Sequence, residues 1–529
     1  MFKAANQRPK INKLLSTVVG VVLMAGVTAC TVGPDFRRPD TPLDAGYTPE
    51  KLSSETSSSN VLGGDAQRFV EADDIPGQWW TLFHSDSLNT LINEALHANP
   101  NLAAAQAALR QARENYYADQ GSLFPNISGT VSATRENVAG GSSSGGSGSG
   151  SSHNILNVTS ASLSVSYALD VFGGTRRQME SAEAQADYER FQLEATYLTL
   201  TTNVVNTAIS LGSLRDQIAA TEDIIKIESD QLELIKKQFK LGAVAPSDVL
   251  AQQANLAQTQ ATLPPLQKQL AQTRNQLMTY LGRFPNQDKG ENFNLTSLNL
   301  PKELPVSLPS KLVEQRPDVR ASEAQLHEAS ANVGVAIANQ LPQFSITGQL
   351  GSTSNSFGSL LTPGTGLWSI GGAIAQTIID GGSLEHRKRA AKAGYDAAAA
   401  QYRGTVLSAF QDVANALRAI QTDADALKAQ ALAEQSALDS LNVSRTQYNL
   451  GMINYVALLN ANQTYENAII NRVRAQAARY SDTAGLFQAL GGGWWNRSDV
   501  APESEGKPGF VYLPPVHEIH LIPELEAGK

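Results

Sequence analysis

The chain has 529 residues; 42% of them are hydrophobic, 17% are charged, and the formal net charge is −9. This composition excludes an intrinsically disordered chain and a polytopic helical membrane protein. The excess of negative charge argues against nucleic acid as a partner. Cys30 is the single cysteine, which excludes a disulfide bond within the chain.

The N-terminus has the pattern of a bacterial secretory signal. Four basic residues in the first 13 positions precede an apolar run over residues 14–27, which is too short for a spanning helix. The run ends in Val27-Thr28-Ala29-Cys30, which resembles the lipidation motif of bacterial lipoproteins. We therefore expect a signal peptide over 1–29 and an acyl chain such as palmitate on Cys30. Thr31 follows the cysteine, which favours the outer membrane. An ordinary signal peptide with an incidental cysteine is the alternative.

The rest of the chain contains a tandem repeat of roughly two hundred residues. Pro100 aligns with Pro317, and Gly242 aligns with Gly451, each within a matching neighbourhood. Two copies of one structural unit are therefore expected, with further segments before, between and after them. The predicted divisions are 30–87, 88–282 (repeat 1), 283–310 (a linker), 311–490 (repeat 2) and 491–529.

Each repeat contains two segments in which apolar and small polar residues alternate. In the first segment, Ile127, Gly129 and Val131 alternate with serine and threonine. Such alternation predicts strands with one apolar and one polar face, as at a boundary between lipid and water. The strands are expected at about 124–137, 157–170, 343–351 and 367–379.

Four strands are too few to close a barrel, because about eight is the smallest number that closes one. An open sheet would leave unpaired backbone groups at its edges, which a bilayer does not tolerate. We therefore expect several copies of the chain to close the sheet together, and two, three or more copies would satisfy this requirement.

A long helical segment follows each strand pair. Residues 176–240 contain no proline, and apolar residues recur there at every seventh position, from Tyr197 through Val204 and Leu211 to Phe239. In the second repeat only Glu434 breaks the corresponding series. A sustained heptad predicts helices that supercoil against neighbouring helices. The expected helices are 88–120, 175–240 and 246–281 in repeat 1, and 311–340, 384–449 and 455–490 in repeat 2.

The chain is expected to turn sharply between the long and the returning helix of each repeat. Gly242 and Gly451 come one step after a last apolar turn, where glycine commonly ends a helix. Pro246 and Asn454 suit the first positions of the returning helices. These two hairpin tips are therefore predicted to form one end of a long tube.

Glycine pairs mark the two strand-to-helix junctions, at Gly173-Gly174 and at Gly381-Gly382. Basic residues follow both junctions, at Arg176-Arg177 and at Arg387-Lys388-Arg389. Positive charge at a helix start opposes the helix dipole. We therefore expect either lipid phosphate groups or solvent around these side chains.

Taken together, these motifs resemble the outer-membrane factors of tripartite efflux pumps, of the lipoprotein TolC/OprM/NodT type. The resemblance rests on Cys30-Thr-Val-Gly-Pro-Asp35-Phe, on Trp79-Trp80-Thr-Leu-Phe83, on the stretch from Leu308 to Asp318 and on the Gly-Gly junctions. It implies a mainly α fold with a membrane β-domain. A homotrimer would form a twelve-stranded outer-membrane β-barrel that continues into a long periplasmic α-helical barrel of coiled-coil hairpins. An equatorial girdle would consist of segments 30–87, 283–310 and 491–529.

The resemblance also implies a function and partners. The chain would be a passive exit duct in outer-membrane lipid for drugs or other small toxic compounds. Its partners would be a periplasmic adaptor protein and an inner-membrane transporter of the resistance-nodulation-division class. The residues show no catalytic, cofactor-binding or metal-binding pattern, so we expect no enzyme activity and no cofactor. The alternatives are the duct of a type I protein-secretion system and a coiled-coil structural lipoprotein without a pore.

In this family the tip of the second hairpin constricts the tube through rings of side chains. By position, the resemblance implies a gating aromatic at Tyr448, an apolar ring at Val456 and, at Asn460, an amide where the family usually has an acid. Ile453 stands where a second acidic residue is common. We therefore predict a periplasmic gate that is not a cation-sensitive carboxylate lock. Tyr448 also ends the heptad series, and packing within the hairpin is its alternative role.

Overall fold

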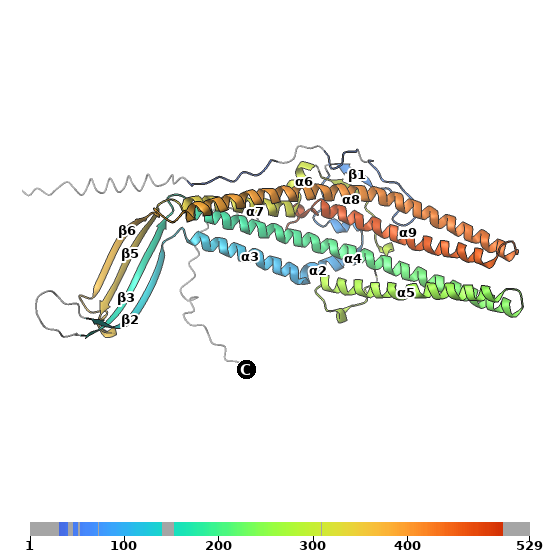
Figure 1. Cartoon of the computed structure of the whole chain (residues 1–529), viewed down its shortest axis with the longest axis horizontal. Coiled ribbons are helices and arrows are strands. Elements are labelled where there is room, and N and C mark those ends of the chain that lie inside the picture. Colours follow the sequence, from blue (N-terminus) through green and yellow to red (C-terminus); the bar gives the residue numbers. More distant parts are fainter. Residues whose placement is uncertain are drawn as a thin grey trace, which may run out of the picture.

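The molecule is a long bundle of helices with a small β-sheet at one end (Figure 1). This computed structural model describes residues 31–40, 46–50, 53–71, 73–139, 153–291, 293–307 and 309–500. The predicted signal peptide, Cys30 and the last part of the predicted C-terminal segment, 501–529, lie outside the described residues.

The sheet has four antiparallel strands in the order β2-β3-β5-β6. Their bounds are β2 (Asn126–Ala139), β3 (His153–Leu169), β5 (Gln343–Ser354) and β6 (Gly366–Ala375). One row of paired residues crosses the whole sheet, from Ile127 through Val165 and Gly348 to Ile370. Apolar side chains of the sheet are largely exposed, including Ile127 at 68% and Ile370 at 76%. The sheet thus presents to its surroundings the apolar face that the alternation predicts.

The fourth strand is shorter than the interval expected for it, 367–379. Strand β6 ends at Ala375, which pairs with Gln343, the first residue of β5. Pro342 precedes Gln343 and has no N–H group to continue the ladder. Residues 376–379 therefore lie beyond the strand, and Ile378 and Ile379 are about nine-tenths exposed.

The first helix of each repeat is split by a proline, where one continuous helix is expected. Repeat 1 has α2 (Asp86–Ala98) and α3 (Pro100–Gly121), and repeat 2 has α6 (Pro309–Gln315) and α7 (Pro317–Ala338). The residue between the two helices is extended in both cases: Asn99 has ψ 121° and Arg316 has ψ 125°. A proline ring disfavours the helical conformation of the residue before it, which accounts for both breaks.

The body consists of two helical hairpins of equal dimensions. Helices α4 (Gly174–Lys240) and α8 (Ser383–Asn449) have 67 residues each, and the returning helices α5 (Pro246–Tyr280) and α9 (Tyr455–Ala489) have 35 each. At 1.5 Å per residue the long helices extend about 100 Å. None of the helices described is both long and apolar enough to cross a bilayer.

The heptad of the second repeat forms a buried seam along α8. Its apolar members Val406, Val413, Ile420, Leu427 and Leu441 are all at most 8% exposed. Glu434, which interrupts the series, forms an ion pair with Arg472 of α9. The break in the pattern is therefore a polar link between the two helices of one hairpin.

The core of the molecule lies around the middle of the long helices. The short helix η1 (Trp79–Phe83) places Trp79, Trp80 and Phe83 there, each at most 1% exposed. Trp79 stacks on Phe487 of α9 with ring centroids 5.4 Å apart. Beside this core, β1 (Arg68–Glu71) pairs in parallel with β4 (Glu303–Val306). Segments from before the first repeat and from between the repeats thus join each other beside the helical body.

Candidate functional site

The two hairpin tips have the turn geometry that their glycines and caps indicate. Gly242 and Gly451 have φ of 71° and 72°, in the left-handed region that glycine adopts readily. Pro246 is the first residue of α5, and the side chain of Asn454 accepts a hydrogen bond from the backbone N–H of Ala457 at 2.9 Å. The expected starts of both returning helices are confirmed.

The four residues predicted for the gate have different surroundings in the second tip. Val456 is 49% exposed, Asn460 is exposed one turn further along α9, and Ile453 is half-buried in the turn. Tyr448 is also half-buried, and its ring meets that of Tyr455 edge-on with centroids 5.6 Å apart. The structure therefore brings Val456 and Asn460 to one exposed face and packs Tyr448 within the hairpin.

Tyr448 belongs to a small apolar cluster at the tip. The buried members of this cluster are Ile235, Leu441, Tyr455 and Leu458, from both hairpins. Burial raises the pKa of Tyr448, and the negative charge of Asp248 on α5 adds to the rise. The packing role left open for Tyr448 thus describes its place in the single chain, and its role as a gating residue stays a prediction.

A polar network near the tip joins the two hairpins, and no local pattern of the sequence indicates it. The Tyr455 hydroxyl of α9 donates to the side-chain oxygen of Gln252 of α5, and the Gln252 amide donates to the backbone oxygen of Glu228 at 2.8 Å. Asn255 of α5 donates to the Glu228 carboxylate and accepts from Gln463 of α9. Its members come from three helices, which is why periodicity within one helix does not reveal them.

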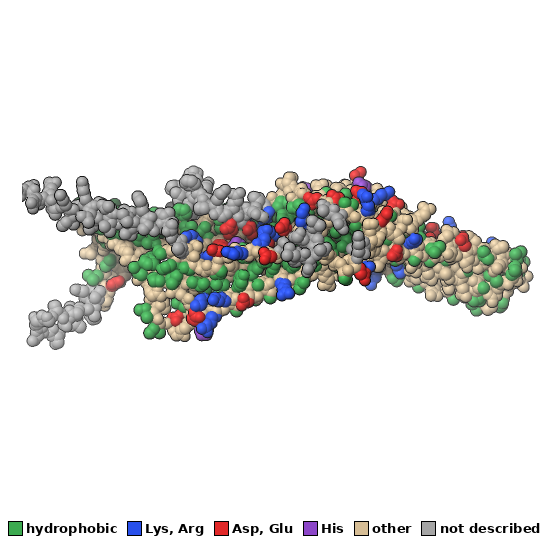
Figure 2. Space-filling model, turned by 90° about the horizontal axis from the view of Figure 1, so that it is seen from above, with side chains coloured by type: hydrophobic (Ala, Val, Ile, Leu, Met, Phe, Trp, Pro, Cys, Tyr) green, Lys and Arg blue, Asp and Glu red, His purple; other side chains and the backbone are tan. Residues whose placement is uncertain are grey.

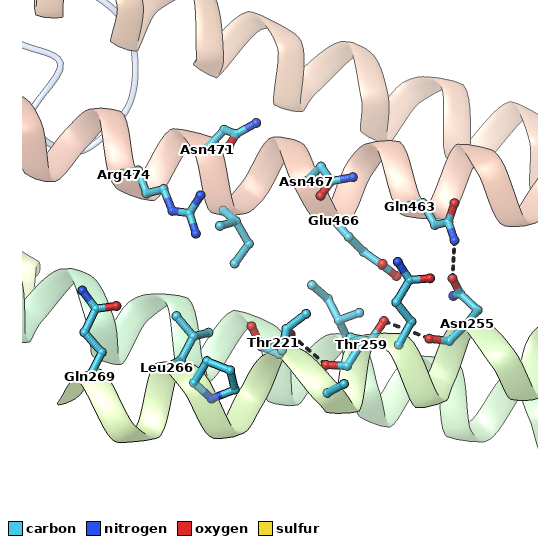
Figure 3. A pocket seen from close by; sticks show the side chains of 16 residues that line it. Thr221, Asn255, Thr259, Leu266, Gln269, Gln463, Glu466, Asn467, Asn471 and Arg474 are labelled. Carbon is cyan, nitrogen blue, oxygen red and sulfur yellow. Dashed lines mark hydrogen bonds between the residues drawn. The ribbon is translucent and has the colours of Figure 1, made fainter. Parts of the chain in front are cut away.

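A groove of about 740 Å³ opens next to this network, between α4, α5 and α9 (Figure 3). Glu466 and Arg474 extend into it from α9, opposite Thr259 and Leu266 of α5. Arg474 donates to the side-chain oxygen of Gln217 on α4 at 3.0 Å. Like the network, the groove lies at the contact between the hairpins, so any movement of one hairpin against the other changes both.

At the first strand-to-helix junction, protein surrounds Arg177 where lipid phosphate or solvent is predicted, whereas Arg387 and Arg389 at the second junction are exposed. Arg177 is 4% exposed, and its guanidinium donates to Asp35 and to Glu180, both at 2.6 Å. Arg176 donates to Asp170 at 3.0 Å. Gly173 and Gly382 stand immediately before α4 and α8 in the left-handed region. The basic residues of the first junction therefore hold the chain together at the point where sheet and helices meet.

Charged side chains are unevenly distributed along the molecule. On the face seen in Figure 2, acidic and basic side chains gather around the middle of the body, and the end that carries the hairpin tips has few of them. This distribution agrees with a second tip in which Ile453, Val456 and Asn460 are uncharged.

The fold and the sequence are similar to those of known outer-membrane proteins. The family model described as "Outer membrane efflux protein" matches residues 91–283 and 308–492. The probable efflux pump outer membrane protein TtgC of Pseudomonas putida is 28% identical over 92% of this chain and 97% of its own length. The cation efflux system protein CusC of Escherichia coli K12 is 27% identical over 91% of this chain and 99% of its own length.

Solved structures show the same architecture. The outer-membrane channel OprN superposes with a TM-score of 0.77 at 28% identity, covering 88% of this chain and 100% of its own. The open state of the Neisseria gonorrhoeae MtrE outer membrane channel gives 0.73 at 26% identity, covering 88% of this chain and 99% of its own. The predicted fold class, long helical hairpins joined to a membrane β-domain and built as an internal repeat, is confirmed. Since the family model matches both repeats, this chain is a member of the outer membrane efflux protein family.

Proposed function

We propose that the chain is the outer-membrane exit duct of a tripartite efflux system and works as a homotrimer. One observation carries the proposal: a four-stranded sheet with an exposed apolar face continues directly into two hairpins about 100 Å long. Such a chain supplies part of a channel wall in the membrane and part of the wall of a tube that extends into the periplasm. The likeness to outer-membrane efflux channels supports the same conclusion.

The edges of the sheet support the oligomeric state. Among the described residues, β2 and β6 each have a paired strand on one side only. Their free backbone groups need partners in lipid. Three copies would join β6 of one chain to β2 of the next and give a closed barrel of twelve strands, above the number of about eight that leaves a filled interior.

The helical part supports the same assembly. The first turns of α8, up to about Gly404, are mostly exposed and rich in alanine. Further along, Leu407 is 63% exposed. Small residues allow a helix of a neighbouring chain to approach closely. That helix would cover the exposed first turns of α8 and Leu407. Neighbouring hairpins would then form the wall of a periplasmic tube.

The substrates and partners of this chain are likewise proposed. We propose passive conduction of drugs or other small toxic compounds, delivered by an inner-membrane transporter of the resistance-nodulation-division class through a periplasmic adaptor. Relatives carry names that mention antibiotics, toluene, cations and pyoverdine, so one architecture serves chemically different cargo. A wide duct without a specific binding site fits this range.

A direct test uses the purified full-length protein in planar lipid bilayers. We expect trimers by native mass spectrometry and stable single-channel currents without added nucleotide. Crosslinking in cells followed by pull-down should recover an adaptor and a transporter of the proposed class. A protein that stays monomeric and passes no current would contradict the duct, and recovery of a type I secretion transporter instead would favour the secretion alternative.

A further inference from the structure

Two carboxyl groups meet inside the contact between the hairpins. Glu228 of α4 is 0% exposed. Its Oε1 atom accepts from the Asn255 amide, and no described residue donates to its Oε2 atom. Glu466 of α9 points toward α5 beside Asn255 (Figure 3), and its carboxyl group neighbours that of Glu228 closely enough for each to affect the ionisation of the other. Because carboxylates are acceptors only, a hydrogen bond between two carboxyl groups requires a proton on one of them.

Among the described residues, no cation forms an ion pair with Glu228 or Glu466. Arg472 of α9 is bound to Glu434, and Arg474 of α9 is bound to Gln217. The nearest side chains of α5 and α9 are the uncharged Gln252, Asn255, Thr259, Tyr455, Asn462 and Gln463. The other charged side chains of α4 and α5 near this level, Glu222, Asp223, Lys226, Asp230 and Lys268, are exposed.

This environment favours the state in which Glu228 and Glu466 together hold one proton at neutral pH. Burial raises the pKa of Glu228, and burial together with the negative charge of Glu228 raises the pKa of Glu466 to about 8. Two like charges at short range oppose each other's ionisation, so the second proton is the difficult one to remove. One proton is then held between two helices that belong to different hairpins.

We propose that Glu228 and Glu466 share one proton and form a pH-sensitive latch between the two hairpins of each chain, an inference that rests on the proposed duct. With the proton in place, one carboxyl donates to the other and α9 stays against α4. Without it, two carboxylates face each other without a cation, and α9 separates from α4.

The neighbouring part of α5 provides a place for the movement. Pro264 and Pro265 lie inside α5, and neither can donate the hydrogen bond that an α-helix places at its position. The carbonyl groups four residues earlier therefore lack their helical donors. Pro265 lines the groove next to Glu466, so the hairpin can bend beside the latch without breaking intact helical bonds.

The direction of the pH effect follows from the raised pKa values. A group whose pKa is raised in the latched state stabilises that state when it is protonated. This stabilisation is complete below the ordinary pKa of the group and is lost as the pH rises through the raised pKa. The latch is therefore closed in acid and at neutral pH and opens as the pH passes about 8. Release of one proton changes the open–closed equilibrium by up to about tenfold per pH unit.

Single-channel recording from about pH 6 to about pH 9 tests the latch. In the native protein we expect the open probability to rise several-fold above neutral pH. Glu466→Gln keeps a hydrogen-bond donor but cannot ionise, so its channels should stay mostly closed across the range. A Glu466→Gln channel that keeps the full pH response would overturn the proposal.

A second acid pair serves as the matched control. Burial, followed by the neighbouring Asp482 carboxyl group of α9, raises the pKa of Asp423 of α8 to about 7. Both residues belong to the same hairpin, so Asp423→Asn should leave the pH response intact. If Asp423→Asn channels lose the pH response, the pH dependence of the open probability results from buried carboxyl groups in general and not from the link between the hairpins.

Infrared difference spectra separate failure of the latch from failure of the duct. The spectrum of the native protein minus that of Glu466→Gln should contain the carbonyl band of a protonated carboxylic acid at neutral pH, and the band should vanish above about pH 8. Absence of the band at neutral pH refutes the shared proton whether or not the protein conducts. Absence of current in a preparation that shows the band refutes the duct alone.

Discussion

At the second hairpin tip, the residues predicted for the gate have different surroundings. Val456 and Asn460 leave the helix on an exposed face, whereas Tyr448 is held by Tyr455 and Leu441. We propose that, in a closed ring of three chains, the exposed pair would narrow the passage directly. Tyr448 would act on the passage through the shape of the hairpin that it stabilises.

Replacing Tyr448 and Asn460 together by alanine should raise the single-channel conductance, because both a ring of amides and the aromatic support behind it are lost. Planar-bilayer recordings provide the measurement. Asn442→Ala, on the exposed side of α8, is the matched control and should leave conductance unchanged. Equal conductance of the double variant and the native protein would remove both residues from the gate.

The sequence alone predicts the positions of some single residues and not of others. The junction glycines, the tip glycines and the caps at Pro246 and Asn454 follow local rules, and the structure has them where these rules put them. Arg177 and Glu228 could not be placed in this way. Their partners, Asp35 for one and Asn255 and Glu466 for the other, come from distant parts of the chain that only the folded molecule brings together.

At the scale of elements, periodicity describes the long helices well and the short ones poorly. Helices α4 and α8 begin within one residue of their expected starts, because the heptad and the absence of proline extend over the whole length. The breaks at Asn99 and Arg316 and the end of β6 at Ala375 depend on single prolines. A periodic pattern of apolar residues does not locate such breaks, because one proline hardly changes the pattern. Each of these prolines can nevertheless be seen in the sequence.

The turn between α8 and α9 gives a prediction at this scale. Gly451→Ala should destabilise the tip by about 1–2 kcal/mol, because φ of 72° is unfavourable for alanine and nothing lies within 4 Å of the added methyl group to cause a clash. Hydrogen exchange of tip amides should quicken by about 5- to 30-fold.

The control for this change is Gly485→Ala, in the interior of α9. Its added methyl group also has no neighbour within 4 Å, and its φ is ordinary. We expect a gain of about 0.5–1 kcal/mol there, since alanine is the better helix former. Slower exchange in both variants would show that the turn does not require the left-handed conformation.

At the scale of the whole molecule, the sheet decides whether the chain enters the membrane. Ile370 and Ser369 are neighbours on β6 and project to opposite faces. Ile370→Arg should reduce the yield of folded trimer in outer-membrane fractions, because arginine on a lipid-facing strand position costs about 2–4 kcal/mol near the bilayer centre. Ser369→Arg should be tolerated on the water-facing side, and equal yields of the two variants would contradict the assigned faces.

Lipidation of the N-terminus is a second prediction for the whole molecule. Cys30→Ser should abolish labelling by a clickable fatty acid in cells, because Cys30 is the only cysteine and the lipidation motif requires its thiol. The labelled band is measured after purification under denaturing conditions. Label that persists on the serine variant would show that the acyl chain is attached elsewhere.

The contacts of the first described residues determine where such an anchor can be. The backbone of Thr31 lies so close to Gly173 that a β-carbon on the glycine would come within 2.9 Å of its α-carbon, and the next residue, Val32, donates to the Phe172 backbone at 3.1 Å. The chain that follows Cys30 is therefore fixed beside the strand-to-helix junction from Thr31 onward. A lipid on Cys30 would therefore enter the bilayer at the level of the strand-to-helix junction. It would fix how deeply the sheet is inserted, in addition to attaching the chain to the membrane.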